Sequence, residues 1–329
     1  MPARPPDHRP PRGATSLSGP LTVVLVALAF SFAWSIGSHY TGACMGMPYA
    51  LGAVKARTAL LLMAPLALLG AALASGRVAT TVGHKLIDAT PTRLGEVVVV
   101  AVAFGVTALY NRIRIPTSTI QLLVGAVVGV AVAGSTRVHW HTIATLAVIW
   151  VAAPPVAAIL GFAGGKSLGR VQRVGGALVL VGCVASFAMG ANDVALASGP
   201  LVGSSVFSPH VAGAVCGVAI ALGVLLTGRP LLNRVAFDIV DVDRATATAA
   251  QLVQALVILV AVSFGYFTSM NQALVGAMAG AGTARGRHAV NRKTLLGIVR
   301  GWTFGPPSSF TLALVVALLI RAAGGSLAH

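Results

Sequence analysis

The residues with the clearest chemical potential are Asn192 and Asp193, which lie side by side in an apolar stretch of small residues, 186–203. The chain has seven acidic residues, and Asp193 is the one that lies deep inside a hydrophobic run. A carboxylate in membrane hydrocarbon costs about 3 kcal/mol on insertion scales, so it is expected to face a polar interior. Gly199 and Pro200 weaken a continuous helix here, and a broken helix frees backbone groups that bind ions. The pair is therefore a candidate ion site. A carboxylate that pairs with an Arg between packed helices is the structural alternative.

Composition places this pair in an all-α polytopic membrane protein. Of the 329 residues, 56% are hydrophobic and 9% are charged, whereas a soluble domain carries about 25% charged residues. Apolar stretches near 20 residues long recur throughout. The net charge of +16 lies in the connections between them, which predicts contact with the lipid bilayer and no nucleic acid partner. The cysteines, Cys44, Cys183 and Cys216, read as buried apolar residues without a disulfide or metal role.

The hydrophobic segments that must position the pair number about five in each half of the chain. Residues 1–20 are a basic, Pro-rich arm predicted to be disordered, and 322–329 form a C-terminal tail. Residues 76–93 and 228–244 read as polar connections. The segments 117–134 and 272–284 are short for a full crossing, which indicates broken or re-entrant helices. The expected segments are 21–45, 57–75, 95–110, 117–134 and 141–163, then 174–198, 208–227, 247–267, 272–284 and 295–320.

An internal repeat relates the two halves. The offsets of the matching landmarks lie between 151 and 155 residues, which is hard to obtain by chance. We expect a first transmembrane repeat over 21–163, a basic linker over 164–173 and a second repeat over 174–321. If an odd number of segments crosses the bilayer in each half, the repeats are inverted and the substrate lies at their interface. The landmarks are Thr117-Ser118 with Thr268-Ser269, Trp150 with Trp302, Gly76-Arg77 with Gly228-Arg229, and Phe32-Ala33 with Phe187-Ala188.

Two hydroxyl-rich turns open the short segments and offer donors for an anion. Helix N-termini bind anions through free backbone N–H groups and the helix dipole, and these side chains would add to that set. Two such turns that meet at a pseudo-twofold axis could surround one tetrahedral ion. Interhelical contact by Ser and Thr is the structural alternative. The candidate donors are Thr117, Ser118 and Thr119 in the first half and Thr268, Ser269 and Asn271 in the second.

The run Gly-Ala-Asn-Asp-Val-Ala-x-Ala-x-Gly-Pro over 190–200 resembles the signature of the inorganic phosphate transporter family, the PiT-type permeases. The resemblance covers nearly the whole chain after residue 20. It implies that a Gly-x-Asn-Asp motif and a Pro-x-Ser-x-Thr-His-type motif in each half together form the phosphate and cation sites. Asn192 and Asp193 match the second-half Asn-Asp motif, and the two hydroxyl turns match the other motif.

The chain departs from the family pattern in its first half, where His39-Tyr40 replaces the Asn-Asp pair. One of two pseudo-symmetric carboxylates is therefore absent, and a site with fewer carboxylates holds sodium less well. His39 could instead titrate near neutral pH and carry a proton together with Asp193. Coupling to H⁺, or loss of coupling, is the resulting hypothesis. Further departures are Ala43 and Leu196 for an Asn, Gln121 and Gln272 for a His, and Phe267 for a Pro.

The sequence thus predicts a secondary symporter of inorganic phosphate, with H⁺ favoured over Na⁺ and no cofactor. No Gly-x-x-x-x-Gly-Lys-Ser/Thr stretch occurs, so the sequence does not indicate a nucleotide-binding domain that would power transport. Sulfate transport and a transport-deficient paralogue that acts as a sensor or accessory subunit are the alternatives, and an enzyme is least favoured. Abundant Ala, Gly, Val and Arg with a single Glu favour a bacterial inner (plasma) membrane. Membrane orientation and assembly into a homo-oligomer stay open.

Overall fold

The computed structural model describes residues 19–88, 92–113, 117–168, 175–232, 243–284, 286 and 292–327. The first 18 residues of the predicted basic arm lie outside the described residues, as do 169–173 of the predicted linker and 328–329 of the tail. Pro116, which precedes the first hydroxyl turn, also lies outside them.

The described elements are helical, as the sequence predicts. Eight helices in the described part of the chain are long and apolar enough to cross a membrane, while α6 and α12 have 15 and 14 residues. Each half therefore contributes four long helices and one short one, which confirms an all-α membrane protein. The bounds are α1 Pro20–His39, η1 Gly42–Gly46, α2 Met47–Ala50, α3 Ala56–Ala74, α4 Gly76–His84, α5 Arg93–Arg112, α6 Thr119–Ala133, α7 Trp140–Leu168, α8 Gly175–Asp193, α9 Ala195–Gly203, α10 Pro209–Thr227, η2 Arg229–Leu231, α11 Arg244–Ser263, α12 Met270–Thr283 and α13 Arg292–Ala322.

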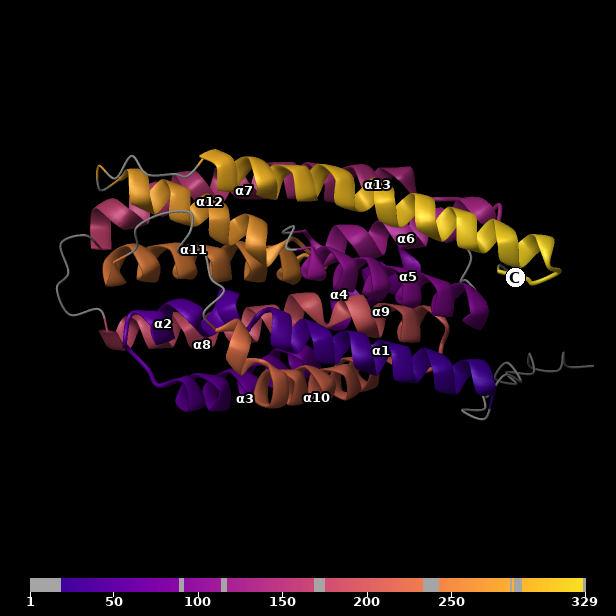
Figure 1. The fold of residues 1–329 in the computed structure, drawn as a ribbon, viewed down its shortest axis with the longest axis horizontal. Helices are drawn as coiled ribbons and strands as arrows, with labels where there is room; N and C mark the ends of the chain where they lie inside the picture. The colour runs from indigo at the N-terminus through magenta and orange to yellow at the C-terminus, as the bar shows by residue number, and fades with distance from the viewer. Residues whose placement is uncertain are drawn as a thin grey trace, which may run out of the picture.

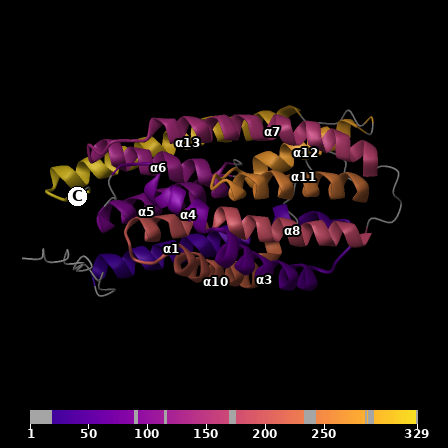
Figure 2. The same cartoon turned by 180° about the vertical axis from the view of Figure 1, so that it is seen from behind.

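The two halves exchange their last long helices. Helix α7 packs against α12 of the second half, and α13 packs against α6 of the first half. Figures 1 and 2 show α7 and α13 along one edge of the molecule, running in opposite directions. Helices α1, α3, α8 and α10 form the opposite edge, where α1 packs on α10 and α3 on α8. Helices α5 and α11 lie between these edges (Figure 1).

Two glycines at equivalent places set the packing of the motif helices. A Cβ at Gly37 of α1 would overlap the carbonyl oxygen of Ile220 on α10, and a Cβ at Gly190 of α8 would overlap that of Ala67 on α3. Both contacts relate the halves by the same offset of 153 residues. Because only a glycine allows such close backbone approach, both packing faces demand one. Tyr40 consequently corresponds to Asp193, three residues beyond these glycines.

The same contacts correct one landmark of the predicted repeat. Gly223 approaches the backbone of Trp34, and Gly70 approaches that of Phe187, again at an offset of 153. Trp34 therefore corresponds to Phe187, and the predicted match of Phe32 with Phe187 is wrong. The sequence match placed two similar aromatic residues together, whereas backbone packing fixes the register.

Two further segments differ from the sequence prediction. The stretch 76–93, predicted as a polar connection, contains the helix α4, whose Val78, Ala79 and Val82 are buried against the rest of the molecule. The short helix buries one apolar face against α9. An average of hydropathy over the whole segment does not detect such a one-sided pattern. The first predicted span, 21–45, is interrupted at Tyr40 and continues through the π-helical turn η1.

Candidate functional site

The second-half motif lies where one helix ends and another begins. Helix α8 ends at Asp193, Val194 forms a turn, and α9 starts at Ala195. Asn192 and Asp193 are fully buried. The helix is thus broken at the motif as predicted, but the break lies at Val194 and not at Gly199 and Pro200, which lie inside α9. The break places both polar side chains inside the protein.

Asn192 joins this break to the second hydroxyl turn. Its Nδ2 donates to the carbonyl oxygen of Thr268 at 2.9 Å, and its Oδ1 accepts from the backbone N–H of Thr268 at 3.2 Å. Its Nδ2 also donates to Oδ2 of Asp193 at 3.1 Å. The amide thus satisfies the turn backbone and holds the carboxylate in one orientation. Oδ1 of Asp193 has no hydrogen-bond partner among the described residues.

The second hydroxyl turn is an N-terminal cap of α12. Oγ of Ser269 accepts from the backbone N–H of Gln272 at 3.4 Å, as an N-cap serine does. Thr268 and Ser269 are fully buried, and Oγ1 of Thr268 finds no partner in the described part of the chain. A buried hydroxyl without a partner is costly, so Thr268 offers a free donor and acceptor at this place.

The first hydroxyl turn leads into α6 with the same residue types. Thr117, Ser118 and Thr119 are at most 5% exposed. Oγ1 of Thr117 and Oγ of Ser118 are without a partner within the described residues. Oγ1 of Thr119 lies 3.0 Å from the phenolic oxygen of Tyr40. This turn therefore also holds buried polar atoms that no protein group satisfies.

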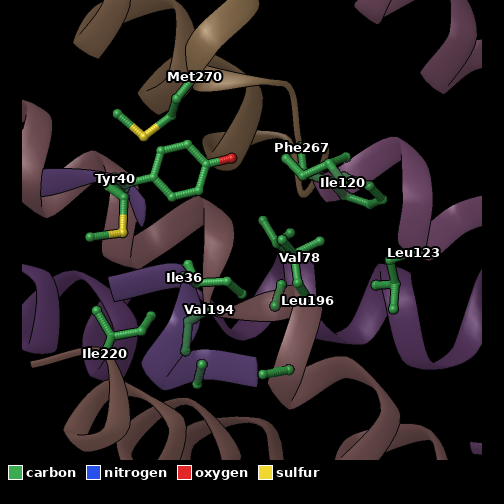
Figure 3. Packing of buried hydrophobic residues seen from close by; sticks show 14 of the residues in the cluster. Ile36, Tyr40, Val78, Ile120, Leu123, Val194, Leu196, Ile220, Phe267 and Met270 are labelled. Carbon is green, nitrogen blue, oxygen red and sulfur yellow. The ribbon is translucent and has the colours of Figure 1, made fainter. Parts of the chain in front are cut away.

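Tyr40 connects the first hydroxyl turn to Asp193. The residue is 1% exposed, and its hydroxyl also faces the Asp193 carboxylate. In Figure 3 the hydroxyl points toward Phe267 and Ile120, which flank the second and first hydroxyl turns in sequence. The structure therefore brings Asn192, Asp193 and Thr119 into one polar cluster with Thr268, by way of Tyr40.

Two predicted residues lie at the margin of this cluster. Asn271 is half-buried in the first turn of α12. His39 is half-buried at the end of α1, with its ring edge-on to Tyr40 at 5.0 Å between centroids. Tyr40 contacts the cluster directly through its hydroxyl.

The sequence prediction missed two glutamines of α11. Both are fully buried. Nε2 of Gln251 donates to the carbonyl oxygens of Ala43 and Cys44 in η1, and Nε2 of Gln254 donates to that of Met270 at 3.3 Å. Their Oε1 atoms lack partners among the described residues. Their polarity inside an apolar helix was the signal that could have found them.

Glu96 was also missed as a buried acid. It is 4% exposed in the first turn of α5, close to Gly203 at the end of α9. The sequence placed it at the edge of an apolar run, where exposure is the usual outcome. No group of three His, Cys, Asp or Glu side chains suited to a metal occurs within the described residues.

The cluster is closed to the surface in this conformation. The Thr and Ser residues of both hydroxyl turns and the Asn-Asp pair are all buried. A pocket of about 600 Å³ does open on the surface, lined by Arg77, His210 and Ser263 among others. None of the predicted site residues lines that pocket, so the chemistry of the buried cluster is the better guide.

The chain is similar to known proteins over most of its length. The Phosphate transporter family (PHO4) matches residues 36–175 and again residues 171–313. The sulfate permease CysP of Bacillus subtilis (strain 168) is 29% identical over 91% of this chain and 88% of its own length. A probable low-affinity inorganic phosphate transporter of Mycobacterium tuberculosis (strain ATCC 25618 / H37Rv) is 31% identical over 80% of this chain and 69% of its own length. A solved structure described as the sodium-dependent phosphate transporter superposes with a TM-score of 0.83 over 92% of this chain and 99% of that chain, at 21% identity.

Proposed function

Because this chain belongs to the phosphate transporter family, a family of membrane transporters and not of enzymes, we propose that it is a cation-coupled symporter of inorganic phosphate. The observation that carries the proposal is that Oδ1 of Asp193 has no hydrogen-bond partner among the described residues. Thr117, Ser118 and Thr268 likewise carry buried hydroxyls without a partner among the described residues. Such a set supplies donors for a tetrahedral anion and one acceptor for a proton that the anion carries.

The packing of the halves supports alternating access around this cluster. Helices α7 and α13 run in opposite directions and each packs on the short helix of the other half. We infer inverted repeats, in which the substrate binds near the midplane at the shared interface. The closed cluster then corresponds to an occluded state, and rocking of one half against the other exposes it to either side.

The lone carboxylate favours phosphate over sulfate. Hydrogen phosphate keeps a proton near neutral pH and can donate it to a carboxylate oxygen, whereas sulfate is a dianion without a proton. Facing sulfate, Oδ1 of Asp193 would lack a donor and would add like-charge repulsion in a buried place. A site that offers hydrogen-bond groups discriminates strongly against an analogue that leaves one of them unpaired.

The same carboxylate supports H⁺ over Na⁺ as the coupling ion. Hard cations are held by several oxygen ligands, and the first half supplies the phenol Tyr40 where the second half supplies Asp193. We propose that Asp193 is ionised when hydrogen phosphate binds and takes up the coupling proton afterwards, and that His39, whose ring lies edge-on to Tyr40, assists this transfer. Asn192, Thr119, Ser269 and Asn271 complete the proposed substrate-binding set.

Sulfate transport is the second candidate, because the Bacillus subtilis relative, which is similar to this chain over most of its length, is described as a sulfate permease. In that case Asp193 would be protonated when the anion binds. The remaining alternative is a phosphate sensor, which would bind phosphate but would not transport it.

We place the protein in a bacterial plasma membrane, where a strain that lacks its other phosphate permeases gives a clean test. Uptake of labelled phosphate is measured with sodium and pH varied separately, and unlabelled sulfate is added as a competitor. Uptake that rises as the external pH falls, is indifferent to sodium and resists sulfate supports the proposal. Uptake of sulfate in preference to phosphate, or no uptake of either anion, overturns it.

A further inference from the structure

Tyr40 occupies the position in the first half that Asp193 holds in the second. The close approaches of Gly37 to Ile220 and of Gly190 to Ala67 fix this correspondence at an offset of 153 residues. Both residues lie at the end of the first long helix of their half. Both are buried, with Tyr40 1% and Asp193 0% exposed.

The phenol reaches across to polar groups from both halves. Its oxygen lies 3.0 Å from Oγ1 of Thr119, at the start of α6, and it faces the carboxylate of Asp193. Figure 3 shows the ring extended from the end of α1, with the hydroxyl directed toward the residues that flank both hydroxyl turns. In the described part of the chain, oxygen atoms of Thr117, Thr268 and Asp193 lack a partner, and these residues belong to the two hydroxyl turns and the end of α8.

We infer that Tyr40 is a substrate-contacting residue that determines how many coupling charges the site takes, an inference that rests on the proposed function. A phenol can donate a hydrogen bond to an oxyanion, but it brings no negative charge of its own at neutral pH. A carboxylate at the same place would need a second cation for compensation. With the hydroxyl of Tyr40 at this place, the site holds one carboxylate in place of two. A single coupling cation then neutralises the charge of that carboxylate when the anion binds.

A purely structural role for the hydroxyl is the alternative. The hydrogen bond to Thr119 joins α1 to the start of α6, and membrane helices use such contacts for packing. The two roles differ in what they alter, because a packing contact affects stability whereas a substrate contact affects anion affinity. Tyr110 offers a matched control, since its hydroxyl lies 3.2 Å from Oγ of Ser308 and joins α5 to α13, and neither residue belongs to the proposed substrate-binding set.

The first test compares Tyr40→Phe with Tyr110→Phe in proteoliposomes, using labelled phosphate and, separately, labelled sulfate. Loss of one hydrogen bond to a charged ligand should raise the KM of Tyr40→Phe by about 10- to 100-fold, whereas Tyr110→Phe keeps the wild-type KM. The unfolding temperatures of the two variants should be similar. An unchanged KM in Tyr40→Phe overturns the inference, as does a larger change in stability without a change in KM.

The second test introduces a carboxylate with Tyr40→Asp. We expect its uptake to depend on sodium, because the site then holds two carboxylates, while wild-type uptake is indifferent to sodium. A sodium response that is the same in both proteins contradicts the inference.

The rise in unfolding temperature on addition of phosphate reports binding in detergent even when flux is lost. A wild type that neither binds nor carries either anion defeats the proposed function, whereas a wild type that transports normally beside an unaltered Tyr40→Phe defeats only the role of Tyr40.

Discussion

Asn192 binds the backbone of Thr268 through both ends of its amide, with the carbonyl of Thr268 as acceptor at 2.9 Å and its N–H as donor at 3.2 Å. The amide thereby fixes the second hydroxyl turn against the end of α8. Since Nδ2 also donates to Asp193, one side chain aligns the turn and the carboxylate together. This relationship explains why the motif needs an amide directly before the acid.

Asn192→Asp keeps the size of the side chain and removes its two donors. The carbonyl of Thr268 loses its partner, and a second carboxylate is placed beside Asp193, so both hydrogen bonding and charge become unfavourable. We expect phosphate uptake to fall by more than about tenfold and the protein to lose about 3–5 kcal/mol of stability if both acids stay ionised. Uptake assays and thermal unfolding in detergent measure the two effects. Wild-type uptake in this variant would refute the positioning role of Asn192.

Asp193→Asn removes the proposed proton acceptor while it preserves the shape of the site. Proton-driven accumulation of phosphate should be lost, and sulfate should compete better because the like-charge repulsion is gone. Competition by sulfate in counterflow, compared between the two proteins, checks both points. His39→Ala tests the proposed assisting group in parallel. If both variants keep uptake that is driven by a pH gradient, the proposed coupling is excluded.

Gly190→Ala and Gly37→Ala should weaken the fold by similar amounts. In each variant the new methyl group meets a backbone carbonyl, at Ala67 or at Ile220, that cannot move without separating two helices. Overpacking of this kind costs about 1–3 kcal/mol. Gly105→Ala is the control, because its Cβ has no neighbour within 4 Å and Ala is the better helix former. Unequal effects at the two packed glycines would argue against equivalent packing of the halves.

Gln251→Leu should destabilise the π-helical turn η1. The carbonyl groups of Ala43 and Cys44 lose the amide that binds them, and an unsatisfied buried polar group costs about 1–3 kcal/mol. Thr107→Val is a control, since that hydroxyl bonds only the carbonyl of Ala103 within its own helix. Thermal unfolding should separate the two variants clearly. A change in Gln251→Leu no larger than in Thr107→Val would show that η1 needs no such support.

Much of the architecture could be predicted from sequence. The long apolar stretches predict spans, because hydrophobicity and length decide insertion, and the spaced Thr-Ser pairs predict the repeat. Asp193 could be singled out because an acid in an apolar run demands a polar surrounding. These signals are local and survive without knowledge of packing.

Other features depend on contacts between distant segments. The position of Tyr40 within the cluster follows from the close approach of α1 to α10 at Gly37. The sequence pattern of α1 alone does not predict this approach. Gln251 acts on a turn 207 residues away in sequence, and α4 is apolar only on the face that meets α9. The register of the two halves was misjudged at Phe32 for the same reason, since backbone packing and not similarity of side chains sets it.

The central claim is that the two hydroxyl turns bind one and the same oxyanion. Thr117→Val and Thr268→Val each remove a buried hydroxyl that has no partner within the described residues, one from each half, with little change of volume. Phosphate affinity of the purified protein, measured by the ligand-induced rise in unfolding temperature, tests the claim directly. We predict that each variant weakens phosphate binding by about tenfold, as expected for loss of one hydrogen bond, while Thr107→Val binds as the wild type does. Wild-type affinity in either Thr117→Val or Thr268→Val would contradict a shared site.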